Sequence, residues 1–235
     1  MRISPETFGL APMADPLSYP GNIPVFDYVF RGDTIEPLSD SSEVDAYLSS
    51  YAVAPLGERH ALVACGSNAS PAQLQVKFAD MNPQSATIPV ISGVLDNAAV
   101  VYSAHISRYG SIPATVMSEP SAQAVVHVLF VDDAQLEIID ATEAHNYRRV
   151  ELAGERITCA VSGPGGGHYL YESRHGALLV DGRPQRLDAL GQAELHVLCA
   201  RRLDLAEPLH EAVRAGRSRP DDATRRLKAE LGVAS

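Results

Sequence analysis

The stretch Leu62–Phe78, LVACGSNASPAQLQVKF, decides how the chain is organised, because three local signals meet in it. It opens as a short apolar run typical of a buried strand, and Gly66 then permits the tight backbone turn that ends the run. Ser70 and Pro71 follow in the order typical of a helix N-cap and a first helical residue. The stretch therefore predicts a strand, a tight turn and a helix, with several free backbone N–H groups at the mouth of the strand.

The amino-acid composition of the chain differs between the segments on the two sides of this stretch. Residues 1–57 are rich in Pro, Gly, Asp and Ser, and they predict an N-terminal extension packed on the domain. Residues 58–185 form the expected domain, and residues 186–235, rich in Ala, Leu, Arg and Glu, predict a C-terminal segment of two or three helices. Within the domain we expect strands at 87–95, 97–107, 113–119, 124–131, 148–162 and 167–173, a helix at 132–145, and a hairpin loop, GPGGG, at 163–167.

Composition restricts the class of protein. A length of 235 residues with 46% hydrophobic residues is enough for one sizeable core, and a net charge of -10 argues against a nucleic-acid partner. No apolar run is long enough for a membrane span and the start lacks a secretory pattern, so we expect no membrane partner and a cytoplasmic location. Cys65, Cys159 and Cys199 are an odd count without metal-type spacing, which predicts reduced thiols and argues against a disulfide framework and a zinc site. The eight histidines show no paired metal spacing, so we expect no required metal.

Two polar features suggest a binding site. The N–H groups of the Gly66–Ala69 loop would form a nest suited to a carboxylate or an oxyanion, although an ordinary strand-to-helix turn explains the same residues. Asp140 and Glu143 lie three apart on one face of the predicted helix, with Tyr147 just past its end. Each feature alone is weak evidence, because a glutamate on an exposed helix face is usually a solvated charge.

Three segments link these features: CGSNASPAQL, YGSIPATV and AVVHVLFVDDAQLEIIDATEAHNYRRVEL. Their order and spacing resemble the gamma-glutamyl cyclotransferase-like family over about residues 61–172. In that family a Tyr-Gly-Ser-Asn loop follows the first strand, and a pattern like Leu-Asp-x-x-Glu-Gly-x-x-Tyr carries the catalytic glutamate. The residues of this chain at the second pattern are Ile139, Asp140, Glu143 and Tyr147.

The resemblance implies an α+β fold, a small mixed β-barrel with flanking helices, in which Glu143 faces the Gly66–Ala69 loop across a cavity. It also implies release of 5-oxoproline and a free amine from a gamma-glutamyl amide by intramolecular attack, with Glu143 as general acid/base, partly shielded from solvent. No cofactor is required. The expected substrate-binding residues are Cys65, Gly66, Ser67, Asn68, Ala69, Tyr109 and Tyr147.

Two departures from the family pattern keep other interpretations open. Cys65 stands where Tyr is usual and Ala144 where Gly is usual, so a non-catalytic small-molecule binding protein of the same fold is one alternative. A second is a Cys65-dependent hydrolase with a histidine as base, the candidates being His60, His105 and His145. The amine half of the substrate, the oligomeric state and the role of the N-terminal extension are left open.

Overall fold

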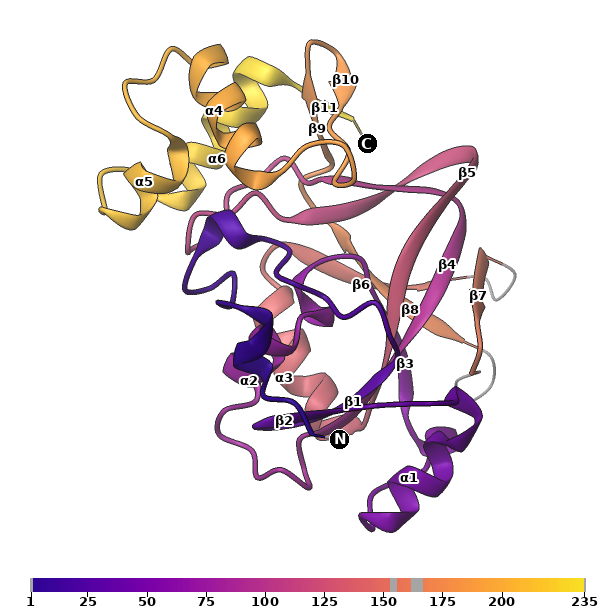
Figure 1. The fold of residues 1–235 in the computed structure, drawn as a ribbon. Helices are drawn as coiled ribbons and strands as arrows, with labels where there is room; N and C mark the ends of the chain where they lie inside the picture. The colour runs from indigo at the N-terminus through magenta and orange to yellow at the C-terminus, as the bar shows by residue number, and fades with distance from the viewer. Residues whose placement is uncertain (1, 153–155, 162–166, 235) are drawn as a thin grey trace.

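The computed structural model describes residues 2–152, 156–161 and 167–234, and it has the mixed α+β architecture expected from the sequence (Figure 1). The main sheet has eight strands in the order β2-β1-β4-β5-β3-β8-β6, with β7 also paired to β4. Its strands are β1 (Tyr28–Arg31), β2 (Thr34–Pro37), β3 (His60–Ala64), β4 (Thr87–Tyr102), β5 (Ala114–Val131), β6 (Tyr147–Leu152), β7 (Ile157–Cys159) and β8 (His168–Ser173).

The closed barrel implied by the resemblance is not found in the described part of the chain. There β2 and β6 are the two ends of the strand order and do not pair with each other. The free edge of β4 is instead taken by two short strands. β1 pairs with it around Val90, and β7 pairs with it at Gly93–Leu95. Because the two end strands of the order do not pair, the sheet is open over the described residues.

The strands β4 and β5 are much longer than expected. Each replaces two strands predicted from the sequence, and together they form one antiparallel ladder from Val90↔Leu129 to Tyr102↔Ala114. The register shifts between Asp96 and Ala98, where Asn97 has a positive φ of 53°. A bulge of this kind lets a strand bend without ending, which explains why the two strands expected at 87–95 and 97–107 form one continuous strand over most of their length.

Two helices lie beside the main sheet near β3, α2 (Pro71–Lys77) and α3 (Asp133–Glu143). The side chains of Asp132 and Gln135 form a reciprocal capping box at the start of α3, with N···O distances of 2.9 and 3.0 Å. Leu74 of α2 and Ile139 of α3 are buried in one core with residues of β1 and β3. This packing brings the end of α3 and the loop before α2 to the same place.

The N-terminal segment joins the main sheet, because β1 and β2 form a hairpin that pairs with β4. It also contains the 3₁₀ helices η1 (Pro5–Phe8) and η2 (Pro16–Ser18), and α1 (Val44–Ser50). The boundaries at 57/58 and 185/186 stay predictions. Of the strand and loop expected at 148–162 and 163–167, residues 153–155 and 162–166 lie outside the described residues.

The C-terminal helices α4 (Gln192–Arg202), α5 (Leu209–Arg214) and α6 (Pro220–Leu231) pack together at one end of the molecule (Figure 1). They share a core with the strand β9 (Ala177–Val180), which pairs with β10 (Arg183–Pro184) and β11 (Val233–Ala234) in a small separate sheet. Among the described residues, no helix is long and apolar enough to cross a membrane.

Candidate active site

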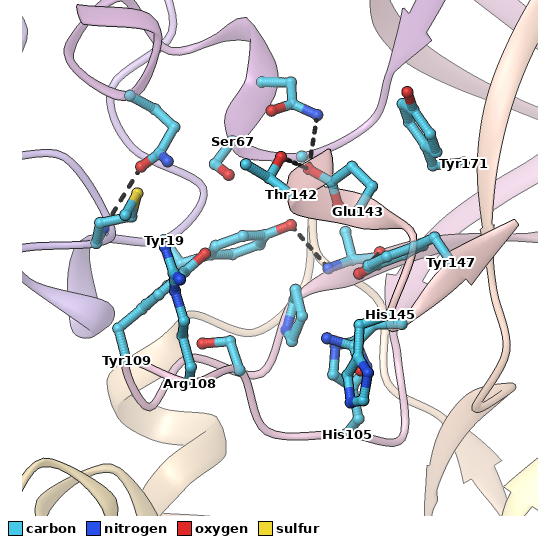
Figure 2. A pocket seen from close by; sticks show the side chains of 18 of the residues that line it. Tyr19, Ser67, His105, Arg108, Tyr109, Thr142, Glu143, His145, Tyr147 and Tyr171 are labelled. Atoms are coloured by element: carbon cyan, nitrogen blue, oxygen red, sulfur yellow. Dashed lines mark hydrogen bonds between the residues drawn. The ribbon is translucent and has the colours of Figure 1, made fainter. Parts of the chain in front are cut away.

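A pocket of about 750 Å³ lies between the end of β3, the helices α2 and α3, and the loop that precedes β5 (Figure 2). The expected site residues that line it are Cys65, Gly66, Ser67, Asn68, Tyr109, Glu143 and Tyr147. Ala69 is fully buried and does not line the pocket. Its carbonyl instead accepts a hydrogen bond from the Tyr28 hydroxyl at 2.7 Å, so Ala69 anchors the loop to the core.

The loop after β3 presents backbone donors at the pocket wall. It forms a single 3₁₀ turn, η5 (Ser67–Ala69), closed by bonds from Ala69 N–H to the Gly66 carbonyl (3.4 Å) and from Ser70 N–H to the Ser67 carbonyl (2.9 Å). Within the described residues, no acceptor is found for the N–H groups of Gly66, Ser67 and Asn68. Such a run of unpaired amides can bind a carboxylate or an oxyanion.

Glu143 is the last residue of α3, and its side chain is 18% exposed. All of its side-chain contacts in the described structure use one oxygen. Oε1 accepts hydrogen bonds from Lys77 Nζ (3.0 Å) and Asn68 Nδ2 (3.3 Å). Thr142 Oγ1 lies 3.5 Å from Oε1 but donates its hydrogen to the Ile139 carbonyl at 2.8 Å. Oε2 has no partner among the described residues. The carboxylate is therefore fixed through one oxygen and free to accept a proton through the other.

Lys77, at the end of α2, is a site residue that sequence reasoning missed. Its side chain is 4% exposed, and its ammonium group donates to Asn68 Oδ1 (2.7 Å) and Thr142 Oγ1 (2.8 Å) as well as to Glu143. These three bonds use all the donors of the group. Lys77 is one of two lysines in the chain and lies eleven residues after Gly66, but its position in the sequence gives no local sign of a contact with Glu143.

Tyr19, from the N-terminal segment, is the second residue that was missed. Its hydroxyl oxygen accepts a hydrogen bond from Ala114 N–H at 2.8 Å, while the Tyr147 hydroxyl donates to the Ala114 carbonyl at 2.9 Å. Burial raises the pKa of Tyr19 and of Tyr147 well above the ordinary value, so both hydroxyls stay protonated. No local pattern in the Pro-rich stretch around Tyr19 signals this contact.

Cys65 lines the pocket as a thiol rather than a thiolate. Burial raises its pKa to about 12. Two of its candidate bases are engaged elsewhere: His60 Nε2 lies 2.7 Å from Asp133 Oδ1, and His105 Nδ1 lies 2.7 Å from Ser103 Oγ. In the part of the chain that is described, Cys65 makes no hydrogen bond to a histidine, although His105 and His145 also line the pocket.

Asp140, the other carboxylate of the matched pattern, does not line the pocket. Its two oxygens bind Arg149 Nη1 at 2.6 Å and the Tyr171 hydroxyl at 2.5 Å. The two carboxylates therefore do not form a pair that shares a proton. No group of three or more His, Cys, Asp or Glu side chains among the described residues is arranged to hold a metal ion.

Comparison with known proteins finds only weak structural similarity to solved structures. No family model and no curated protein matches the chain. Among solved structures, an Arabidopsis thaliana protein has a TM-score of 0.37 and 19% identity over 50% of this chain and 70% of its own. A gamma-glutamyl cyclotransferase has a TM-score of 0.35 and 17% identity, and a Homo sapiens protein 0.34 and 18%, each over 67% of this chain and 88% of its own. Values this low assign the chain to no family, so the case for function rests on the pocket.

Proposed function

We propose that the protein is a gamma-glutamyl cyclotransferase-like enzyme that releases 5-oxoproline and a free amine from a gamma-glutamyl amide. One observation supports this above the others. The carboxylate of Glu143, whose side chain is 18% exposed, and the unpaired N–H groups of Gly66, Ser67 and Asn68 line the same pocket. A base for an ammonium group and donors for an oxyanion are the two elements that this ring closure needs.

In the proposed reaction the substrate supplies its own nucleophile. Glu143 takes a proton from the α-ammonium group, and the α-nitrogen attacks the γ-carbonyl carbon, whose π electrons move to the oxygen. The tetrahedral intermediate collapses by breaking the bond to the departing nitrogen. Over the reaction the α-nitrogen loses two protons and the departing nitrogen gains two, with Glu143 as the carrier. Holding the two ends in reach can supply about 7–11 kcal/mol of the barrier.

The loop amides act on the carbonyl oxygen in this scheme. They bind the negative charge that develops there, and loss of one such donor typically costs about 2.7–4 kcal/mol of barrier. The contacts of Asn68 and Lys77 to Oε1 hold the carboxylate at the pocket wall, so that Oε2 stays in a fixed position. The amine half of the substrate would lie in the remaining volume of the pocket.

A turnover assay on a panel of gamma-glutamyl amines and amino acids tests the proposal. We expect the wild type to form equal amounts of 5-oxoproline and free amine, and Glu143→Gln to lose this activity while keeping its fold. Cys65→Ala is the matched control, because it changes a pocket residue that has no chemical role in the scheme. Activity that survives in Glu143→Gln and disappears in Cys65→Ala would favour the thiol hydrolase instead.

One feature favours a second candidate, a binding protein without turnover. Glu143 is already paired with the ammonium group of Lys77, which compensates its charge before any substrate ammonium arrives. A binding protein would leave the whole panel intact, yet one of the same compounds would raise the thermal unfolding temperature, because a ligand of the folded state stabilises it. The assay and a thermal-shift measurement on the same panel separate the two candidates.

A further inference from the structure

The hydroxyl group of Tyr19 has an unused donor at the pocket wall. Tyr19 is 6% exposed and lines the pocket. Its oxygen accepts the N–H of Ala114, and in the described structure its hydrogen has no acceptor. Figure 2 shows the ring reaching into the pocket, with the hydroxyl end towards Glu143 and Tyr147.

Three other buried tyrosines donate their hydroxyl hydrogen to a backbone carbonyl of the protein. Tyr28 donates to the Ala69 carbonyl, Tyr147 to the Ala114 carbonyl and Tyr102 to the Leu190 carbonyl. In Tyr19 the bond from Ala114 N–H fixes the oxygen while leaving the O–H bond available. Buried donors usually have a hydrogen-bond acceptor, so an unused donor at a pocket wall indicates that a bound ligand supplies the acceptor.

The Tyr19 hydroxyl lies next to the loop that carries the backbone donors. A Cβ atom added to Gly66 would overlap the Tyr19 hydroxyl oxygen, so that oxygen sits directly over the glycine that opens the loop. Cys65, Tyr109 and Glu143 are close enough to add to the burial that raises the pKa of Tyr19. The group is therefore a neutral donor across the working pH range rather than a base.

We propose that Tyr19 is a catalytic residue that donates its hydroxyl hydrogen to the oxyanion formed from the γ-carbonyl, beside the N–H groups of Gly66, Ser67 and Asn68. The inference rests on the proposed function and makes the N-terminal segment part of the active site. No proton is transferred: the carbonyl oxygen gains the π electrons as the carbon–nitrogen bond forms, and it returns them when the bond to the departing nitrogen breaks. A donor that binds this charge more strongly than it binds the neutral carbonyl lowers the barrier more than it tightens ground-state binding.

The variant Tyr19→Phe tests the proposal, because it removes one oxygen atom and keeps the ring. We expect kcat to fall about 10²–10³-fold, with KM changed less than about threefold. The matched control is Tyr102→Phe, a buried tyrosine outside the pocket that loses its bond to a backbone carbonyl, and we expect it to keep wild-type kinetics. An active wild type whose Tyr19→Phe variant keeps kcat within about threefold would overturn the role of Tyr19 and leave the proposed function standing.

A wild type that turns over no gamma-glutamyl compound would overturn the proposed function, and Tyr19 is then judged by binding. The probe is 5-oxoproline, whose carboxylate and lactam carbonyl can both accept hydrogen bonds, with its affinity measured by calorimetry. Wild-type binding that weakens at least about fivefold in Tyr19→Phe but not in Tyr102→Phe supports a ligand-facing hydroxyl. Equal affinities, or no binding to the wild type, would overturn it.

Discussion

Replacing Lys77 by methionine should destabilise the protein strongly, because it leaves Glu143 without its cation. The ion pair spans 3.0 Å, with side-chain exposures of 4% and 18%. At an effective dielectric constant near 20, two unit charges at this separation attract by about 5.5 kcal/mol. Desolvation offsets much of this attraction in the intact pair, but removing one partner of a buried pair typically costs about 3–5 kcal/mol.

We expect Lys77→Met to lose about 3 kcal/mol of unfolding free energy, the lower end of that range, because Glu143 keeps some contact with water. For a chain of this size, each kcal/mol corresponds to about 2–4 °C, so the melting temperature should fall by about 6–12 °C. The measurement is urea unfolding of the wild type, Lys77→Met, Glu143→Gln and the double variant. The double variant should be more stable than the sum of the single effects predicts by at least about 1.5 kcal/mol.

The exposed pair of Arg148 and Glu172 is the matched control for this cycle. Its side chains are 63% and 40% exposed, and pairs of this kind contribute about 0–1 kcal/mol. The coupling in Arg148→Met with Glu172→Gln should therefore stay below about 1 kcal/mol. If Lys77→Met with Glu143→Gln were additive within about 0.5 kcal/mol, the pair would not hold Glu143 in place and the reasoning about the anchored Oε1 would be refuted.

Three further predictions concern other parts of the pocket and the C-terminal helices. Gly66→Ala should lower the free energy of unfolding by about 1–3 kcal/mol, because its Cβ would overlap the Tyr19 hydroxyl, and adding Tyr19→Phe should restore part of that loss. The control Gly57→Ala, with open space around its Cβ, should leave stability unchanged, so an equal loss at both glycines would contradict the contact. Burial lowers the pKa of His196 from 6.5 to about 3, so its contribution to stability is complete above about pH 6.5 and is lost as the pH falls towards 3. In urea unfolding below pH 6.5, His196 should contribute up to about 1.4 kcal/mol per pH unit to the slope of stability against pH, and His196→Gln should remove that contribution; an unchanged slope would count against it. Because the pKa of Cys65 is raised to about 12, iodoacetamide near pH 8 should label this residue only after unfolding, as peptide mass mapping would show; rapid labelling of the folded protein would contradict a buried thiol.

The local parts of the fold were predictable because their signals are short in range. The start of α3 follows from the capping box of Asp132 and Gln135, three residues apart, and the start of α2 follows from Ser70 and Pro71. Even there one detail differs, since the Ser70 side chain makes no capping bond and is packed against Gly21. Local propensity fixes where a helix begins, whereas tertiary packing decides which side chains complete it.

The candidate site was only half predictable. The Gly66–Ala69 loop and Glu143 were expected to face each other from the resemblance, and the structure brings them to one pocket apart from Ala69. Lys77 and Tyr19 were not expected, because their partners are distant in the chain: Lys77 lies 66 residues from Glu143, and Tyr19 lies 95 residues from Ala114. Neither pairing leaves a local pattern that a single sequence can reveal.

The open sheet, found where a closed barrel was expected, was not predictable because it also depends on contacts between distant parts of the chain. The strand-like runs of the sequence show where strands can form, but not how the runs join into longer strands or which strands pair with the free edge of β4. That edge is occupied by β1, which comes from the N-terminal segment before the expected domain, and by β7, which lies near the end of the domain in sequence. Pairing between strands that are distant in the sequence depends on the whole sheet, so short-range sequence patterns do not predict which strands pair.

Turnover in water enriched in ¹⁸O tests the central claim most directly, because it reports which atom attacks the γ-carbonyl carbon. If the α-nitrogen attacks, with Glu143 as proton carrier, the product is 5-oxoproline whose carbonyl oxygen comes from the substrate, and its mass is unchanged. Mass spectrometry of the wild-type reaction should show this unlabelled product, and Glu143→Gln should form none. Glutamate carrying one solvent oxygen would show that water attacks instead, and it would contradict the account.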